Sequence, residues 1–126
     1  MQAQEFISNV QMESGLDSPE AAERIVAAVF ETLGERLPRT RQAHLAAQMP
    51  KQLQALLQQR LEQAVFTMEE FHNRVASRAQ IGFPEARRDT LSVLKVLRKA
   101  VSLGELRHVF AELPLDYQKL LEIEES

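Results

Sequence analysis

The chain carries one sequence pattern twice, and this duplication limits the folds it can adopt more than any other feature. Residues 5–57 and 70–121 match at an offset of 65 positions, which becomes 64 in the later part of each copy. The matched pairs are Glu5-Phe6 with Glu70-Phe71, Val10 with Val75, Pro19 with Pro84, Val29 with Leu94, His44 with His108, and Pro50 with Pro114. A repeat of this length predicts two similar structural units that bury apolar surface against each other.

Apolar residues recur at helical spacing in both copies, and no stretch alternates with the period of a β-strand. Each copy predicts four helices, which gives eight in the chain. In the first copy the predicted helices cover about residues 3–14, 19–37, 40–49 and 50–61. In the second copy they follow Thr67, the break at Gly82-Phe83-Pro84, the segment Leu103-Gly104-Glu105, and Pro114.

Several helix starts carry residues with capping side chains. Ser18 is expected to cap the second helix, with Pro19 at its first position, where a missing N–H is no loss. Thr40 is expected to cap the third helix. Thr67 and Glu70 form a capping box at the start of the second copy.

These patterns predict an all-α fold, in which duplicated four-helix units form one helical bundle with pseudo-twofold symmetry. The whole chain, residues 1–126, is expected to be a single domain, because short helices bury little surface alone. The alternative is two separate units joined through the fourth helix. The candidate linker, residues 58–66, is expected to be helical for most of its length.

Composition and charge exclude several classes of protein. The chain has no cysteine, which excludes disulfides, thiolate metal sites and a cysteine nucleophile. Its net charge of −3 gives no overall attraction to nucleic acid or anionic lipid. The longest apolar-rich run, Ile25 to Phe30, is too short to span a bilayer, and the first residues do not resemble a signal peptide. We therefore expect a soluble cytoplasmic protein that has no cofactor and does not contact a membrane.

Four motifs occur in a characteristic order in the first copy. They are Glu5-Phe6-Ile7 followed by Val10, Glu20-Ala21-Ala22-Glu23-Arg24, Thr32-Leu33-Gly34-Glu35-Arg36-Leu37, and His44-Leu45-Ala46-Ala47-Gln48-Met49-Pro50. Together they resemble a bacterial family catalogued as domain of unknown function 2267 (DUF2267). The resemblance continues through Phe71, Arg74-Val75, Leu113-Pro114 and Tyr117, so it covers nearly the whole chain. It implies an all-helical duplicated domain and supplies no activity.

Five basic residues on the predicted sixth helix form the first candidate site. At about 100° per residue they fall within a sector of about 120°. These residues are Arg87, Arg88, Lys95, Arg98 and Lys99. Such a face could bind the phosphates of a nucleic acid or an acidic partner, and Arg74 and Arg78 could extend it. A solvated helix face is the other interpretation, since Asp89 lies beside the cations and no aromatic residue is interleaved to stack on bases.

His44 and His108 occupy equivalent positions in the two copies and are weak candidates for metal ligands. If the copies pack about a pseudo-dyad, the two imidazoles could face each other and share a metal or titrate as a coupled pair. Neither copy supplies a second ligand at a matching i+3 or i+4 position, so the sequence predicts no complete metal site. The histidines are otherwise interpreted as residues at the margin of a short helix.

The seam between the copies could also form a groove for a partner helix, a second copy of the chain or a small molecule. Its candidate residues are Met12, Met49, Phe66, Met68 and Phe110.

No catalytic motif is present, and an enzyme is not expected. The sequence favours a small bacterial protein-interaction or regulatory module, with an unknown protein partner or a homodimer. The alternatives are a nucleic-acid-associated protein that uses the basic face on residues 87–99, and a small-molecule or metal binder in the seam.

Overall fold

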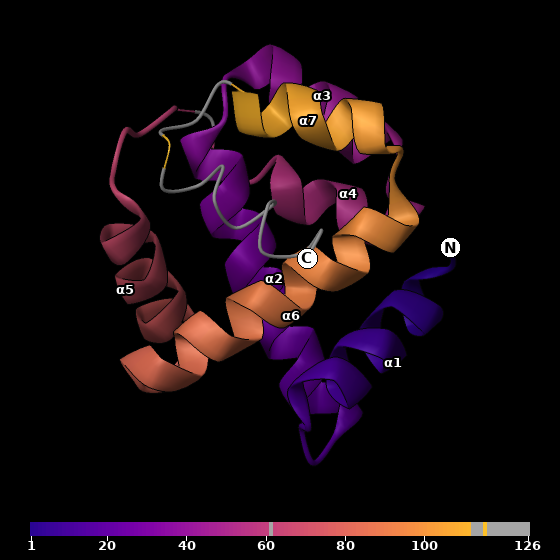
Figure 1. Cartoon of the computed structure of the whole chain (residues 1–126), viewed down its shortest axis with the longest axis vertical. Coiled ribbons are helices and arrows are strands. Elements are labelled where there is room, and N and C mark those ends of the chain that lie inside the picture. The colour runs from indigo at the N-terminus through magenta and orange to yellow at the C-terminus, as the bar shows by residue number, and fades with distance from the viewer. Residues whose placement is uncertain (61, 112–114, 116–126) are drawn as a thin grey trace.

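The computed structural model describes residues 1–60, 62–111 and 115, and within them the chain is all-α, with seven helices and no strand (Figure 1). The helices are α1 (Ala3–Ser14), α2 (Pro19–Arg36), α3 (Arg39–Ala47), α4 (Lys51–Leu57), α5 (Met68–Ala79), α6 (Phe83–Ala100) and α7 (Leu103–Ala111). The eighth helix, expected after Pro114, lies outside the described residues.

Local chemistry accounts for the starts of α2 and α5, as the sequence predicts. The Ser18 hydroxyl accepts a hydrogen bond from the Ala21 amide (3.1 Å), and Pro19 is the first residue of α2. The Thr67 hydroxyl accepts from the Glu70 amide (3.2 Å) at the start of α5. Both caps are confirmed, as are the predicted spans of the first two helices.

Two predictions in the middle of the chain are wrong. Thr40 does not cap α3, because that helix already begins at Arg39, with Pro38 at the N-cap and no side-chain cap. The stretch 58–66 is not helical over its described residues, since α4 ends at Leu57.

The later part of this stretch, residues 63–66, hydrogen-bonds to the end of α2. The Ala64 amide donates to the Glu35 carbonyl (2.8 Å), and the Gln63 side chain donates to the Arg36 carbonyl (3.2 Å). In return, Arg36 Nε donates to the carbonyl of Phe66 (3.3 Å). Carbonyls in the last turn of a helix have no partner within that helix, so the linker satisfies them. Helical spacing alone cannot predict this exchange.

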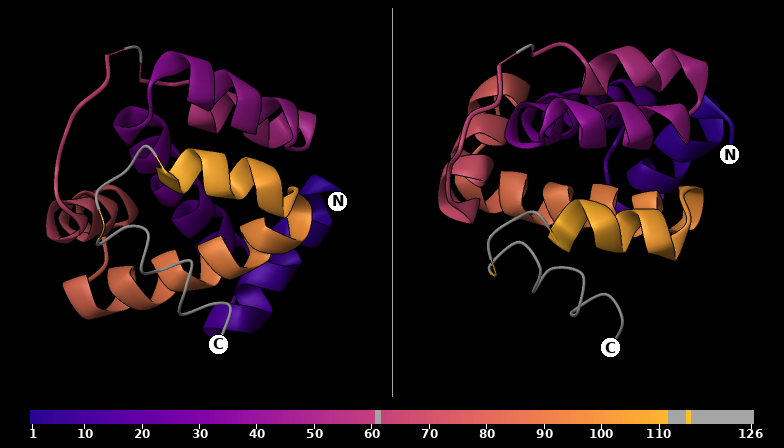
Figure 2. Two further views of the ribbon diagram at one scale, coloured as in Figure 1. Left: turned by 45° about the horizontal axis from the view of Figure 1, so that its top comes forward. Right: turned by 90° about the horizontal axis from the view of Figure 1, so that it is seen from above.

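Helix α2 lies at the centre of the molecule and packs against α1, α4, α5 and α6. In Figure 1, α6 crosses in front of α2, and α3 lies beside α7 at one end. Figure 2 shows the same arrangement from two other directions, with α3 and α4 on one side of the molecule and α6 and α7 on the other. Helix α6 also contacts α1 and α5, so it joins elements from both copies.

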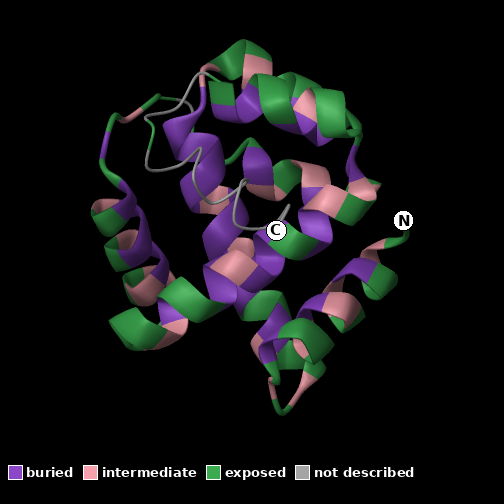
Figure 3. Ribbon diagram, in the orientation of Figure 1, coloured by how far each residue is buried: buried purple, intermediate pink, exposed green. Residues whose placement is uncertain are grey.

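All seven helices contribute buried hydrophobic residues to one core. Figure 3 shows these residues facing inward along each helix. Phe6 of α1 and Phe30 of α2 meet edge to face, with ring centroids 5.5 Å apart. Each fully buried side chain of this size stabilises the fold by about 1.5–3 kcal/mol.

Candidate binding site on the basic face of α6

Helix α6 is amphipathic, and its buried side determines where its cations point. The buried residues face α1, α2 and α5. They are Ala86, Asp89, Thr90, Ser92, Val93, Leu94, Val96 and Leu97. The five basic residues predicted as a site lie away from this stripe, and we call them the basic face. Arg87, Arg88, Lys95 and Lys99 are exposed, and Arg98 is half-buried.

The structure brings three of these five cations together around one pocket. Lys95, Arg98 and Lys99 line an open pocket of about 310 Å³ where α6 passes the end of α1. The fourth lining residue is Glu13 of α1, and we call this site the α6 pocket. Lys95 Nζ lies 3.4 Å from Glu13 Oε1. Among the described lining residues, three cations stand against one carboxylate, which gives this set a net positive charge.

Arg98 and Lys99 also have a structural role, because they lie in the last turn of α6. Cations there interact favourably with the negative end of the helix dipole, typically by 0.3–1 kcal/mol each. Such an interaction leaves the charged groups accessible, so it does not compete with binding an anion.

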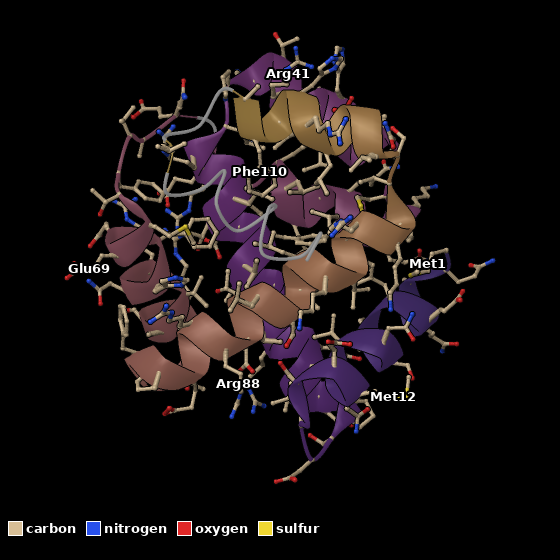
Figure 4. The ribbon with its side chains drawn as sticks, in the orientation of Figure 1. Met1, Met12, Arg41, Glu69, Arg88 and Phe110 are labelled. Carbon is tan, nitrogen blue, oxygen red and sulfur yellow. The ribbon has the colours of Figure 1, made fainter. Side chains whose placement is uncertain are left out.

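Arg88 is committed to a contact within the protein. Its Nε donates to Asp89 Oδ1 (2.9 Å), and the same oxygen accepts a hydrogen bond from Ser14 Oγ (2.8 Å). Asp89 is buried, and its hydrogen bond and charge raise the pKa of Arg88. Figure 4 shows Arg88 near the end of α1. This residue therefore helps to tie α1 to α6.

Arg87 lies near the start of α6, close enough to His72 of α5 for its positive charge to influence the pKa of the imidazole. His72 is buried, with its ring edge-on to Phe71 (6.2 Å) and Phe83 (5.6 Å). Burial is the main cause that lowers the pKa of His72 to about 4, and the positive charge of Arg87 lowers it further. His72 is therefore neutral at physiological pH and belongs to the core.

Arg74 and Arg78 do not extend the basic face, so that expectation is wrong. Both face α2, where Arg74 Nη1 and Arg78 Nη2 each lie 2.9 Å from Glu35 Oε1. Arg78 also donates to the Thr32 hydroxyl (2.8 Å), and Arg74 lies over the Phe66 ring at 4.1 Å. Aromatic contact and charge pairing hold both arginines between the helices.

Burial and charge act on Glu35 in opposite directions. Burial by itself raises the pKa of the carboxyl, but the hydrogen bonds and charges of Arg74 and Arg78 outweigh it and hold the pKa below its usual range. Beside Glu35, a second cavity of about 510 Å³ opens along the linker. Its lining residues are Glu35, Gln59, Arg60, Glu62, Gln63 and Ala64. Arg60 is paired with Glu31 there (2.6 Å), which connects the linker to α2.

The two candidate metal ligands lie on α3 and α7, which pack against each other. His44 and His108 are both exposed, and each precedes a buried residue, Leu45 and Val109. No group of three or more His, Cys, Asp or Glu residues that could hold a metal occurs in the part of the chain that the structure describes.

The predicted seam is filled by the protein's own side chains. Met49, Phe66, Met68 and Phe110 are buried, and Figure 4 shows Phe110 inside the bundle. Met12 is instead 71% exposed on the outer side of α1, so these five residues do not form one groove.

Comparison with models of known protein families gives a match that covers most of the chain. The family model described as "Uncharacterized conserved protein (DUF2267)" matches residues 3–120. The chain belongs to this family. A comparison with curated proteins found no match for this DUF2267 member. None of its described helices combines the length and the apolar character needed to cross a bilayer.

Proposed function

We propose that this DUF2267 protein is a non-enzymatic interaction module that binds an acidic partner protein through the basic face of α6. The observation that carries the proposal is the α6 pocket, where Lys95, Arg98 and Lys99 converge at the surface of a chain with a net charge of −3. Concentrating cations on one face of an acidic protein favours a specific acidic partner over general attraction to polyanions.

A protein partner fits the α6 pocket better than a nucleic acid does. Glu13 would repel phosphates and carboxylates alike, so the difference lies in what a nucleic acid needs besides cations. Within the part of the chain that the structure describes, no residue lining the pocket is aromatic, so none offers a ring on which a base could stack. The nucleic-acid alternative keeps the support of the exposed cations, and the experiment below includes it as a competing outcome.

We further propose that the two copies form related units about a pseudo-twofold axis within one domain in the cytoplasm. Paired helix lengths support this: α1 and α5 have 12 residues, α2 and α6 have 18, and α3 and α7 have 9. Gly15 and Gln80, which correspond between the copies, both adopt a left-handed conformation after the first helix.

The experiment measures binding by fluorescence anisotropy with three labelled probes: decaglutamate, a single-stranded oligonucleotide and a DNA duplex. We expect the protein to bind decaglutamate more tightly than either nucleic acid, and raising the salt from about 50 to 300 mM to weaken binding roughly tenfold. The double variant Lys95→Gln/Lys99→Gln should weaken binding by roughly fivefold or more, since each exposed charge contributes up to about 1 kcal/mol.

The matched control removes two exposed cations from other helices, as Arg24→Gln/Arg39→Gln. It changes the net charge equally and should retain most of the binding. Equal losses in the two double variants, tighter binding of an oligonucleotide, or no binding of decaglutamate would each contradict the proposal.

A further inference from the structure

Among the described residues that line the α6 pocket, Glu13 is the one that is acidic, and it occupies the place that an incoming carboxylate would take. Its Oε1 lies 3.4 Å from Lys95 Nζ, with Arg98 and Lys99 lining the same pocket. The side chains of Glu13 and Lys95 are 35% and 44% exposed. Ion pairs of this exposure are weak because water competes for both charges. A second carboxylate can therefore replace Glu13 at little cost.

The backbone at Glu13 is held in place, so only its side chain can move. The next residue, Ser14, is buried and hydrogen-bonded to the buried Asp89 of α6 (2.8 Å). Gly15 then ends α1 in a left-handed conformation, with its amide donating to the Met12 carbonyl (3.3 Å). These contacts fix the end of α1 against α6, and the Glu13 carboxylate can leave the pocket by rotation of its side chain alone.

We propose that Glu13 is a resident competitor for the α6 pocket, which an Asp or Glu side chain of an acidic partner protein displaces. The partner carboxylate takes the place of Glu13 beside Lys95, and Arg98 and Lys99 receive its neighbouring acidic groups. Glu13 thereby lowers affinity for weakly charged surfaces and selects for segments with several carboxylates. This inference rests on the proposed function and names the regulation of the same site.

The test compares decaglutamate binding to the wild type and to Glu13→Gln in about 50 mM salt. Removing the competitor should tighten binding by roughly two- to fivefold, which corresponds to one exposed ion pair. The matched control is Glu69→Gln, which removes the same charge from an exposed position on α5, far from the end of α1 (Figure 4). It should change the affinity by less than twofold.

A double-mutant cycle then shows whether Glu13 acts through Lys95. In a Lys95→Gln background the gain from Glu13→Gln should disappear, because the contact that it releases is already gone. All these residues are exposed or half-buried, and matching circular dichroism spectra would show that each variant is folded.

The outcomes separate the two proposals. If the wild type binds decaglutamate but Glu13→Gln binds no more tightly than Glu69→Gln, the competitor role is overturned while the proposed function stands. An equal gain with and without Lys95 overturns it as well. If neither the wild type nor Glu13→Gln binds decaglutamate, the proposed function itself fails.

Discussion

At the scale of single residues, the two copies make the turn after their first helix with different amino acids in the same left-handed conformation. Gly15 (φ 65°) and Gln80 (φ 58°) each follow the first helix of their copy. In both places the next residue donates back across the turn, from Leu16 to Gln11 and from Ile81 to Ala76, at 3.0 Å. Only glycine adopts this conformation without steric cost, so the second copy makes the same turn with a strained residue.

Replacing Gln80 with glycine should therefore stabilise the protein. The side chain of Gln80 is exposed, and relieving its left-handed backbone is expected to raise the free energy of unfolding by about 1 kcal/mol. Urea denaturation followed by circular dichroism would measure the change. Gln80→Ala is the control, because it removes the same side chain but keeps the Cβ that causes the strain. An equal gain in both variants would mean that the side chain, and not the backbone, is responsible.

The spacing of residues predicts on which side of a helix most side chains lie, but not which residues of other helices they contact. Helical spacing correctly placed Lys95, Arg98 and Lys99 together on one side of a helix. It could not identify Glu13 as their neighbour, since that contact depends on how α1 crosses α6. Periodicity is a property of one helix, whereas a pocket needs the arrangement of two.

At the scale of elements, a glycine of α2 allows a close approach between two helices. Gly34 lies against the backbone of Leu57 at the end of α4, and a Cβ at this position would overlap the Leu57 carbonyl. The approach brings the end of α4 close to α2, where the linker begins. Glycine in a helix interior normally costs about 0.5–1 kcal/mol, and here close packing explains its presence.

Two glycine-to-alanine substitutions should therefore have opposite effects. Gly34→Ala should destabilise the fold by about 1–3 kcal/mol, because α4 must shift to admit the methyl group. Gly104→Ala in α7 is the control, since no described atom outside its own stretch of helix and its chain neighbours lies within 4 Å of the position of its Cβ. That variant should gain about 0.5–1 kcal/mol from its better helix propensity. Thermal unfolding of both would measure the difference, and a stable Gly34→Ala protein would contradict the close approach.

Local signals predict most of the elements correctly but fail at Thr40, whereas contacts between residues distant in sequence are not predicted. The Ser18 and Thr67 hydroxyls each accept a hydrogen bond within the first turn of the helix that follows, and Pro19 is the first residue of α2, as the sequence predicts. The prediction of a helical linker is wrong because the linker hydrogen-bonds to the end of α2, which is distant in sequence and which helical spacing cannot reveal. The pairing of Arg74 and Arg78 with Glu35 was missed for the same reason.

At the scale of the whole molecule, acid acts on the fold through two buried groups. His72 has its pKa lowered to about 4 in the folded state, against an ordinary value of 6.5. As the pH falls from 6.5 to about 4, the unfolded chain gains a proton at this residue that the folded chain does not. Stability must therefore fall through that window. Glu35, whose folded pKa lies below its usual value of 4.5, adds a further loss only at lower pH.

The pH dependence of unfolding tests this directly. Between pH 6.5 and about 4, the wild type should lose up to about 3 kcal/mol through His72, since each unit of pKa shift corresponds to about 1.4 kcal/mol. His72→Leu keeps an apolar side chain between Phe71 and Phe83 and should flatten the profile in this window. Asn73→His is the control: it adds an imidazole at an exposed neighbouring position, where folding does not change proton binding, and should leave the slope unchanged. Urea denaturation at half-unit pH steps would give each profile. The reason to expect a flat profile is that His72 is buried where α5 packs against α6, so protonating its imidazole opposes that packing. A His72→Leu protein that lost stability as steeply as the wild type would show that acid acts through other groups.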